Sequence, residues 1–193
     1  MSVDGLSDRR CVTVGNHGLL GVDFTWRNGR FHQTIFRQSH DVRCPLATSC
    51  EEDTHGPWPL SPVLQQLDDV DLPDGRRGIV GLGMAGQNHW SLSIEPTEDG
   101  SLRYDVACRV KKGPPTFLGS TFQAIGQSPT SGKSAPDRES PEVGPGPLEL
   151  VSWQADTQIE RQADRWIARP AVACQELSTS ATVRWCFSVR LTA

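Results

Sequence analysis

The segment from Asn88 to Val110 constrains the fold of this chain more than any other stretch. Its two arms, 88–95 and 102–110, each alternate apolar and polar residues. Successive side chains of a strand point to opposite faces, so each arm has one apolar face and one polar face. The Asp99–Gly100 pair between the arms suits a turn that needs a positive backbone dihedral. The pattern predicts an antiparallel hairpin, with its apolar face at the centre of the core.

A second hairpin is predicted around Asn28–Gly29, which is the strongest short-range signal for a two-residue turn. Its first arm, 20–27, alternates like a half-buried strand. Its second arm places Phe31 and Ile35 on one face and Phe36 on the other. Apolar residues on both faces predict that this arm is buried on both sides or contains a bulge.

The rest of the chain is dominated by short β-like segments. These are 10–14, 77–84, 117–125, 148–153, 172–177 and 183–191. Residues 38–62 are predicted to be a loop. Ser61–Pro62 suits the start of a short helical turn. In 155–168, Thr157 and Glu160 resemble a capping box and predict a helix, although a twisted strand pair fits the same span.

Together these segments predict a mainly β protein, an antiparallel β-sandwich or open barrel of about nine strands with at most two short helices. The chain of 193 residues is interpreted as a single β-rich domain, 1–193. Residues 126–147 contain five prolines, four glycines and four serines, without apolar periodicity. They are expected to form a disordered surface excursion.

Composition narrows the partners that the chain can be expected to bind. The net charge is −4, and no run of lysines or arginines stands out. We therefore expect neither nucleic acid nor an anionic membrane as a partner. The first ten residues contain no apolar run typical of a signal peptide. The expected location is the cytoplasm, where the six cysteines would stay reduced.

The glycines Gly81, Gly83 and Gly86 match the spacing of a dinucleotide-binding motif. In that motif the pyrophosphate binds at the N-terminus of the helix that follows. Here the following residues predict a strand, so the glycines are interpreted as a bulge or a tight corner.

A metal site is a further hypothesis for the predicted loop. His40, Cys44, Cys50 and His55 supply the nitrogen and sulfur ligands that zinc prefers. Their spacing lacks a close Cys-x-x-Cys pair, which favours a polar loop with two reduced cysteines over a zinc-organised domain. No other cofactor is indicated.

A calcium loop is also considered for the aspartates that precede Gly75. Their spacing departs from the EF-hand pattern, which favours a solvated acidic edge strand. The aspartates are Asp68, Asp69, Asp71 and Asp74.

The polar face of the first hairpin carries His89, Arg103, Asp105 and Arg109. Serines nearby suggest a catalytic triad, but no nucleophile-elbow motif accompanies them. Cross-strand ion pairs, such as Glu95 with Arg103, are the ordinary explanation. As a hypothesis, these four residues contribute to a ligand- or partner-binding surface.

The tryptophans divide into two groups. Four of them, Trp26, Trp90, Trp153 and Trp185, fall on apolar strand faces and are expected in the core. Trp58 lies between prolines in the predicted loop, where it suits contact with a partner or a sugar ring, or closure of the sandwich end.

The absence of a convincing catalytic constellation favours a non-enzymatic binding or interaction module that recognises an unknown protein or small ligand. Two alternatives remain open. One is an enzyme with a pocket at a β-barrel mouth, which clustering of the polar hairpin residues would favour. The other is a zinc-organised domain that uses loop 40–55.

Overall fold

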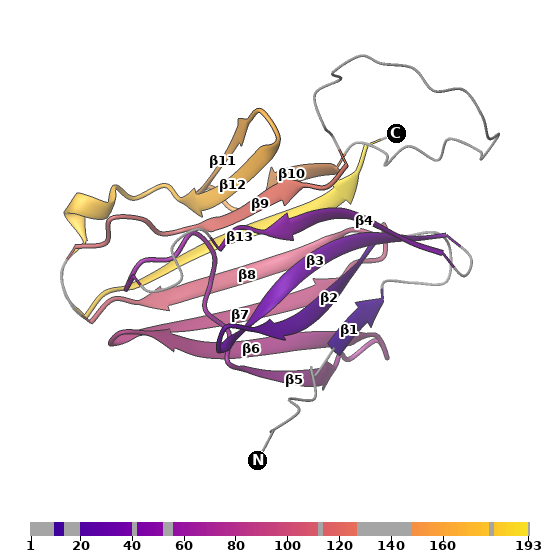
Figure 1. Ribbon diagram of the computed structural model, residues 1–193, viewed down its shortest axis with the longest axis horizontal. Coiled ribbons are helices and arrows are strands. Elements are labelled where there is room, and N and C mark those ends of the chain that lie inside the picture. The colour runs from indigo at the N-terminus through magenta and orange to yellow at the C-terminus, as the bar shows by residue number, and fades with distance from the viewer. Residues whose placement is uncertain are drawn as a thin grey trace.

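The structure is a computed structural model that describes residues 10–13, 20–39, 42–51, 56–111, 114–126, 148–177 and 180–192. These residues form two antiparallel sheets (Figure 1). The predicted mainly β fold class is confirmed, and the described residues contain thirteen strands, more than the nine expected. The predicted excursion at 126–147 lies, apart from Gly126, outside the described residues.

The two sheets have the following strands, in spatial order. The seven-stranded sheet consists of β1 (Arg10–Thr13), β2 (Leu20–Arg27), β3 (Arg30–Ser39), β4 (Val42–Ser49), β9 (Ser120–Ala124), β12 (Arg165–Pro170) and β11 (Thr157–Gln162). The six-stranded sheet consists of β10 (Leu148–Ser152), β13 (Thr182–Leu191), β8 (Leu102–Arg109), β7 (Asn88–Pro96), β6 (Arg77–Ala85) and β5 (Gln66–Asp71).

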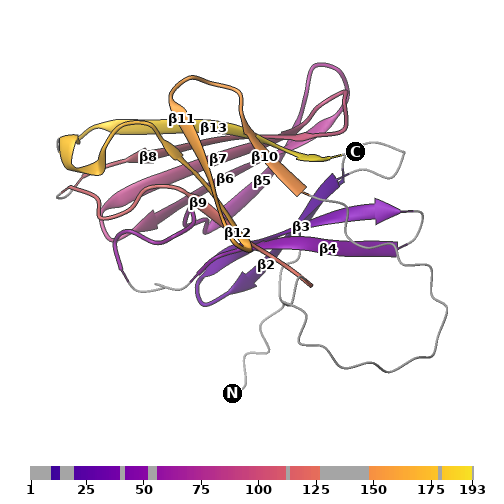
Figure 2. The same cartoon turned by 90° about the horizontal axis from the view of Figure 1, so that it is seen from above.

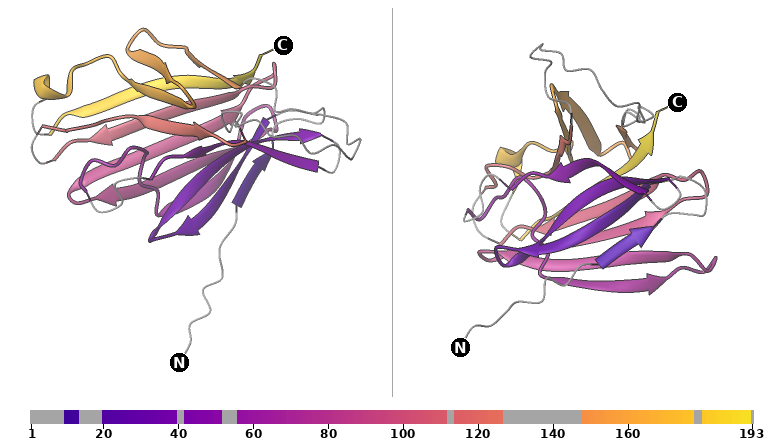
Figure 3. Two further views of the ribbon diagram at one scale, coloured as in Figure 1. Left: turned by 45° about the horizontal axis from the view of Figure 1, so that its top comes forward. Right: turned by 45° about the vertical axis from the view of Figure 1, so that its right-hand side comes forward.

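The sheets pack face to face as a sandwich. In Figure 2 the six-stranded sheet forms one layer and β2, β3 and β4 lie in the other, with the β11–β12 hairpin crossing between them. This hairpin covers the edge of β13, where the Cys186 amide donates a hydrogen bond of 2.7 Å to Thr157 Oγ1. On the other side of the molecule β1 approaches β6 (Figure 3).

Aromatic side chains from both sheets meet in the core. Tyr104 of β8 stacks on Phe187 of β13, with ring centroids 4.8 Å apart, and meets Phe122 of β9 edge to face at 6.0 Å. Trp185 of β13 donates a hydrogen bond of 3.1 Å from Nε1 to Ser120 Oγ on the opposite sheet. These contacts join the two layers, because Phe122 and Ser120 belong to one sheet and their partners to the other.

Both predicted hairpins are present. Asn88–Pro96 pairs with Leu102–Arg109, and the apolar positions of both arms are buried as expected. Asn28 and Gly29 have φ values of 52° and 79°, as a tight two-residue turn requires. The arm predicted to contain a bulge or to be buried on both sides shows a register shift between Ile35 and Phe36.

The sequence misassigned three segments. The predicted loop 38–62 contains β4, whose Leu46 and Ala47 are buried against the core. The predicted helical turn after Ser61 has no helical structure, and the Leu64 carbonyl accepts a hydrogen bond from the Phe31 amide. The predicted strand 172–177 contains instead a single 3-10 turn, Cys174–Glu176.

The ambiguous segment 155–168 is a strand pair, so the helix prediction is wrong. Its strands β11 and β12 turn at Ala163, which has a φ of 49°. The tryptophan prediction is wrong in part, because Trp26 and Trp153 are 37% and 38% exposed. Trp26 lies near the end of β2, and Trp153 follows the end of β10, where its ring packs against Arg103 rather than into the core.

Candidate functional site

The polar residues predicted on the first hairpin lie on the outer face of the six-stranded sheet. His89 of β7 is the register partner of Arg109 of β8, and both side chains are exposed. Asp105 forms an ion pair with Arg184 of β13 and is also 3.5 Å from Cys186 Sγ. The four residues therefore share one face, as the alternation predicted.

Arg103 has a contact that the sequence did not suggest. Its guanidinium lies over the ring of Trp153, 4.8 Å from the centroid, although Glu95 is its register partner across the hairpin. Arg103 is thus occupied by Trp153, just after β10, and Asp105 by Arg184 of β13. Pairs of this exposed kind contribute at most about 1 kcal/mol to stability.

The other two predicted residues, His89 and Arg109, line a shallow open depression of about 510 Å³. Exposed apolar side chains lie beside them, Leu82 at 48% and Met84 at 44% exposure. Among the described lining residues, His89 and Arg109 are the only ones with ionisable side chains, and both are basic. The depression therefore combines accessible apolar surface with two basic side chains.

One glycine of the predicted motif, Gly83, lines this depression. Gly81 and Gly83 lie within β6, and Gly86 has a φ of 60° in the turn to β7. A strand follows the glycines in place of the helix that a pyrophosphate requires. The segment at Val63–Gln65 passes over Gly83 instead, and the Gln65 amide donates a hydrogen bond of 2.7 Å to the Leu82 carbonyl.

Trp58 is buried, with 9% exposure, and belongs to the core cluster. This position agrees with closure of the sandwich end, which was one of the two expectations. Its role in binding a partner stays a prediction.

The hypothetical zinc ligands are only partly described. His40 and His55 lie outside the described residues, while Cys44 is partly buried against the core and Cys50 is buried. Among the residues that the structure describes, no group of three or more metal-binding side chains comes together. Of the calcium-loop aspartates, Asp74 pairs with Arg76, and Asp69 and Asp71 pair with Arg77.

A second polar cluster, which the sequence did not predict, lies where β3 and β4 part. Toward the start of β3 and the end of β4, the last pair of residues in register is Thr34 with Thr48. Beyond it, the Gln33 amide donates a hydrogen bond of 3.0 Å to the Ser49 hydroxyl, and the Phe31 amide bonds to Leu64. Side chains and a neighbouring segment thus replace the strand pairing at this point.

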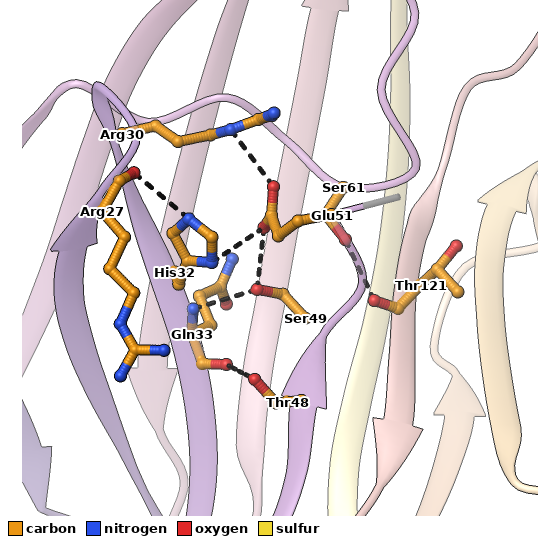
Figure 4. A network of polar contacts seen from close by, with 9 residues as sticks. All are labelled: Arg27, Arg30, His32, Gln33, Thr48, Ser49, Glu51, Ser61 and Thr121. Carbon is orange, nitrogen blue, oxygen red and sulfur yellow. Dashed lines mark hydrogen bonds and ion pairs between the residues drawn. The ribbon is translucent and has the colours of Figure 1, made fainter. Parts of the chain in front are cut away.

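Glu51 is central to this cluster (Figure 4). Its Oε2 is 3.2 Å from Arg30 Nε, and its Oε1 accepts a hydrogen bond of 3.0 Å from the Ser49 hydroxyl. His32 Nδ1 is 3.9 Å from the same Oε1, and His32 Nε2 is 3.2 Å from the Arg27 carbonyl oxygen. We call Arg30, His32, Ser49 and Glu51 the Arg30 cluster.

Burial dominates the electrostatics of the Arg30 cluster. It raises the pKa of Glu51, although Arg30 and the Ser49 hydroxyl act in the opposite direction. It lowers the pKa of His32, an effect that the Arg27 carbonyl opposes and that the positive charges of Arg30 and Arg27 reinforce. Both groups are therefore shifted toward their neutral forms.

No short motif marks the Arg30 cluster, because its members come from two strands and the residues after them. One signal was present in the sequence. The arm that starts at Arg30 was predicted to be buried on both sides or to contain a bulge, and burial on both sides would include Arg30 and His32, which alternate with Phe31.

Comparison of the chain with protein-family models, with curated proteins and with solved structures finds no match. In the described part of the chain, no helix has the length and apolar character needed to span a membrane.

Proposed function

We propose that this β-sandwich is a non-enzymatic binding module that takes an acidic peptide segment of a partner protein on the outer face of β6, β7 and β8. The observation that carries the proposal is the depression in which exposed Leu82 and Met84 lie beside His89 and Arg109. Exposed apolar side chains grouped in this way are typical of interaction sites.

Charge complementarity selects the partner. The depression presents basic groups without an acidic residue among its described lining, so a segment with aspartate or glutamate on either side of an apolar residue matches it. The apolar residue of the peptide would contact Leu82 and Met84, while its carboxylates would face His89 and Arg109. The open shape suits a surface-bound peptide better than an enclosed small molecule.

The test uses a short fluorescein-labelled peptide with a central leucine between glutamates, and a second peptide with lysines in place of the glutamates. Fluorescence anisotropy is measured for the full chain at low and physiological salt. The proposal expects saturable binding of the acidic peptide that weakens as salt screens the charges. It expects the lysine peptide to bind at least about tenfold more weakly.

A matched pair of double variants locates the site. Met84→Gln with Arg109→Gln removes one apolar and one cationic group from the depression. The control variant, Val42→Gln with Arg77→Gln, removes one apolar and one cationic side chain from outside the depression. These two residues are 66% and 67% exposed. Loss of binding in the first variant only supports the proposal, and equal binding by both variants contradicts it.

A further inference from the structure

The guanidinium of Arg30 is the least satisfied buried charge among the described residues. Arg30 is 3% exposed, and its Nε faces Glu51. Its Nη1 and Nη2 are buried and, within the described structure, have no hydrogen-bond partner. Buried donors are nearly always paired, and a buried ionised donor left unpaired costs more than a neutral one.

Among the described residues, eight buried side-chain atoms have no hydrogen bond, and Arg30 is the one residue that contributes two of them. Figure 4 shows Arg30 beside Glu51, with the end of its guanidinium pointing away from the other labelled side chains.

Within the described structure, Glu51 satisfies only part of the Arg30 guanidinium. Glu51 meets the guanidinium through Nε alone, and its other oxygen is engaged by the Ser49 hydroxyl. The two Nη atoms form a fork that matches a planar pair of oxygens. Within the described structure neither Nη atom has a hydrogen-bond partner. An acceptor with two coplanar oxygens is the group that this fork lacks.

The geometry points to a binding site for the carboxylate of a small organic acid, held by Arg30 Nη1 and Nη2. A monoanionic carboxylate fits better than a dianionic phosphate, because the negative charge of Glu51 lies on the Nε side of the same guanidinium. Because Arg30 is 3% exposed, entry to the site requires local opening, which the absence of β3–β4 backbone pairing beyond Thr34 and Thr48 favours.

This site is separate from the acidic-peptide surface. Arg30 lies in the seven-stranded sheet, whereas His89 and Arg109 lie in the six-stranded sheet. Loss of binding at one surface therefore leaves binding at the other intact, and failure of one proposal does not decide the other.

The test titrates the full chain with sodium acetate and with sodium phosphate, each against sodium chloride at equal ionic strength, and follows the thermal midpoint and the calorimetric binding heat. The expected result is a saturable rise of the midpoint with acetate, and weaker binding of phosphate. No saturable effect of acetate would mean that water alone satisfies Arg30, and tighter binding of phosphate would overturn the choice of carboxylate.

Two variants make the test specific. Arg30→Lys keeps the positive charge but removes the fork and is expected to weaken acetate binding at least about tenfold. Arg43→Lys is its matched control, since Arg43 lies on the neighbouring strand and already has Asp23 as its partner at 2.9 Å.

Glu51→Gln provides the second arm. It removes the competing negative charge, so acetate is expected to bind more tightly than to the wild-type chain. A gain of affinity cannot arise from misfolding, so this variant decides the matter even if Arg30→Lys fails to fold. Unchanged or weaker acetate binding by a folded Glu51→Gln variant would overturn the proposal.

Discussion

Replacement of Gly83 by alanine tests the close packing of the Val63–Gln65 segment against β6. A Cβ added at Gly83 would lie 2.3 Å from the Val63 carbonyl oxygen and 3.0 Å from the Gln65 amide nitrogen. Ordinary contacts begin at 3.4 Å, so the Val63–Gln65 segment would have to move by about 1 Å. These neighbours are backbone atoms, which cannot rotate away as the end of a side chain can.

The expected cost combines two effects. Forced displacement of packed atoms costs about 1–3 kcal/mol. The movement also disturbs the 2.7 Å hydrogen bond from the Gln65 amide to the Leu82 carbonyl, which is worth about 1 kcal/mol. We therefore expect Gly83→Ala to lower the free energy of unfolding by about 2–4 kcal/mol.

Urea unfolding followed by circular dichroism measures this change. Gly81→Ala is the matched control on the same strand, because its added Cβ would meet only the flexible ends of Leu64 and Leu67 at 3.0 Å. The control should lose about 1 kcal/mol or less. If Gly83→Ala is as stable as Gly81→Ala, the segment does not cross β6 at this point, and this explanation of the glycine motif is wrong.

Three further changes follow from the core, the Arg30 cluster and the cysteines. Trp185→Phe removes the hydrogen bond to Ser120 between the sheets, and urea unfolding should show a loss of about 2 kcal/mol; no loss would contradict that bond. The lowered pKa of His32 means that the folded state binds its proton less well than the unfolded state, so stability falls as the pH drops below 6.5. His32→Gln should reduce this fall between about pH 7.5 and 5.5 in urea titrations, and an unchanged pH dependence would refute the assignment. Burial raises the pKa of Cys108 to about 12 and that of Cys186 to about 11, so iodoacetamide at mildly alkaline pH should label the partly exposed Cys174 and Cys44 before Cys108 and Cys186, as peptide mass spectrometry would show; labelling of Cys108 at the rate of Cys174 would contradict this order.

The sequence predicted those parts of the fold whose signals are local. Alternation over 88–110 and the Asn28–Gly29 turn both correspond to hairpins in the structure, because period and turn chemistry act within a few residues. The β11–β12 hairpin was only one of two alternatives for residues 155–168, for the opposite reason. Its turn uses Ala163 with positive φ, a conformation that alanine rarely adopts, so no turn signal marked it.

The candidate sites were predictable to different degrees. Strand alternation placed His89 and Arg109 on one outer face, but the exposed Leu82 and Met84 beside them depend on how β6 pairs with β7. The Arg30 cluster depends on contacts between residues far apart along the chain, such as Arg30 with Glu51 and Ser61 with Thr121. Patterns in a single sequence do not indicate contacts between residues so far apart along the chain.

The most direct test of the proposed function is a map of backbone amide shifts of the isotope-labelled chain during titration with the glutamate–leucine peptide. The proposal predicts the largest shifts at Leu82, Met84, His89 and Arg109, with the amides of β2, β3 and β4 unchanged. Shifts centred on β2, β3 and β4, or no saturable shifts anywhere, would contradict the assignment of the outer face of β6, β7 and β8 as the binding surface.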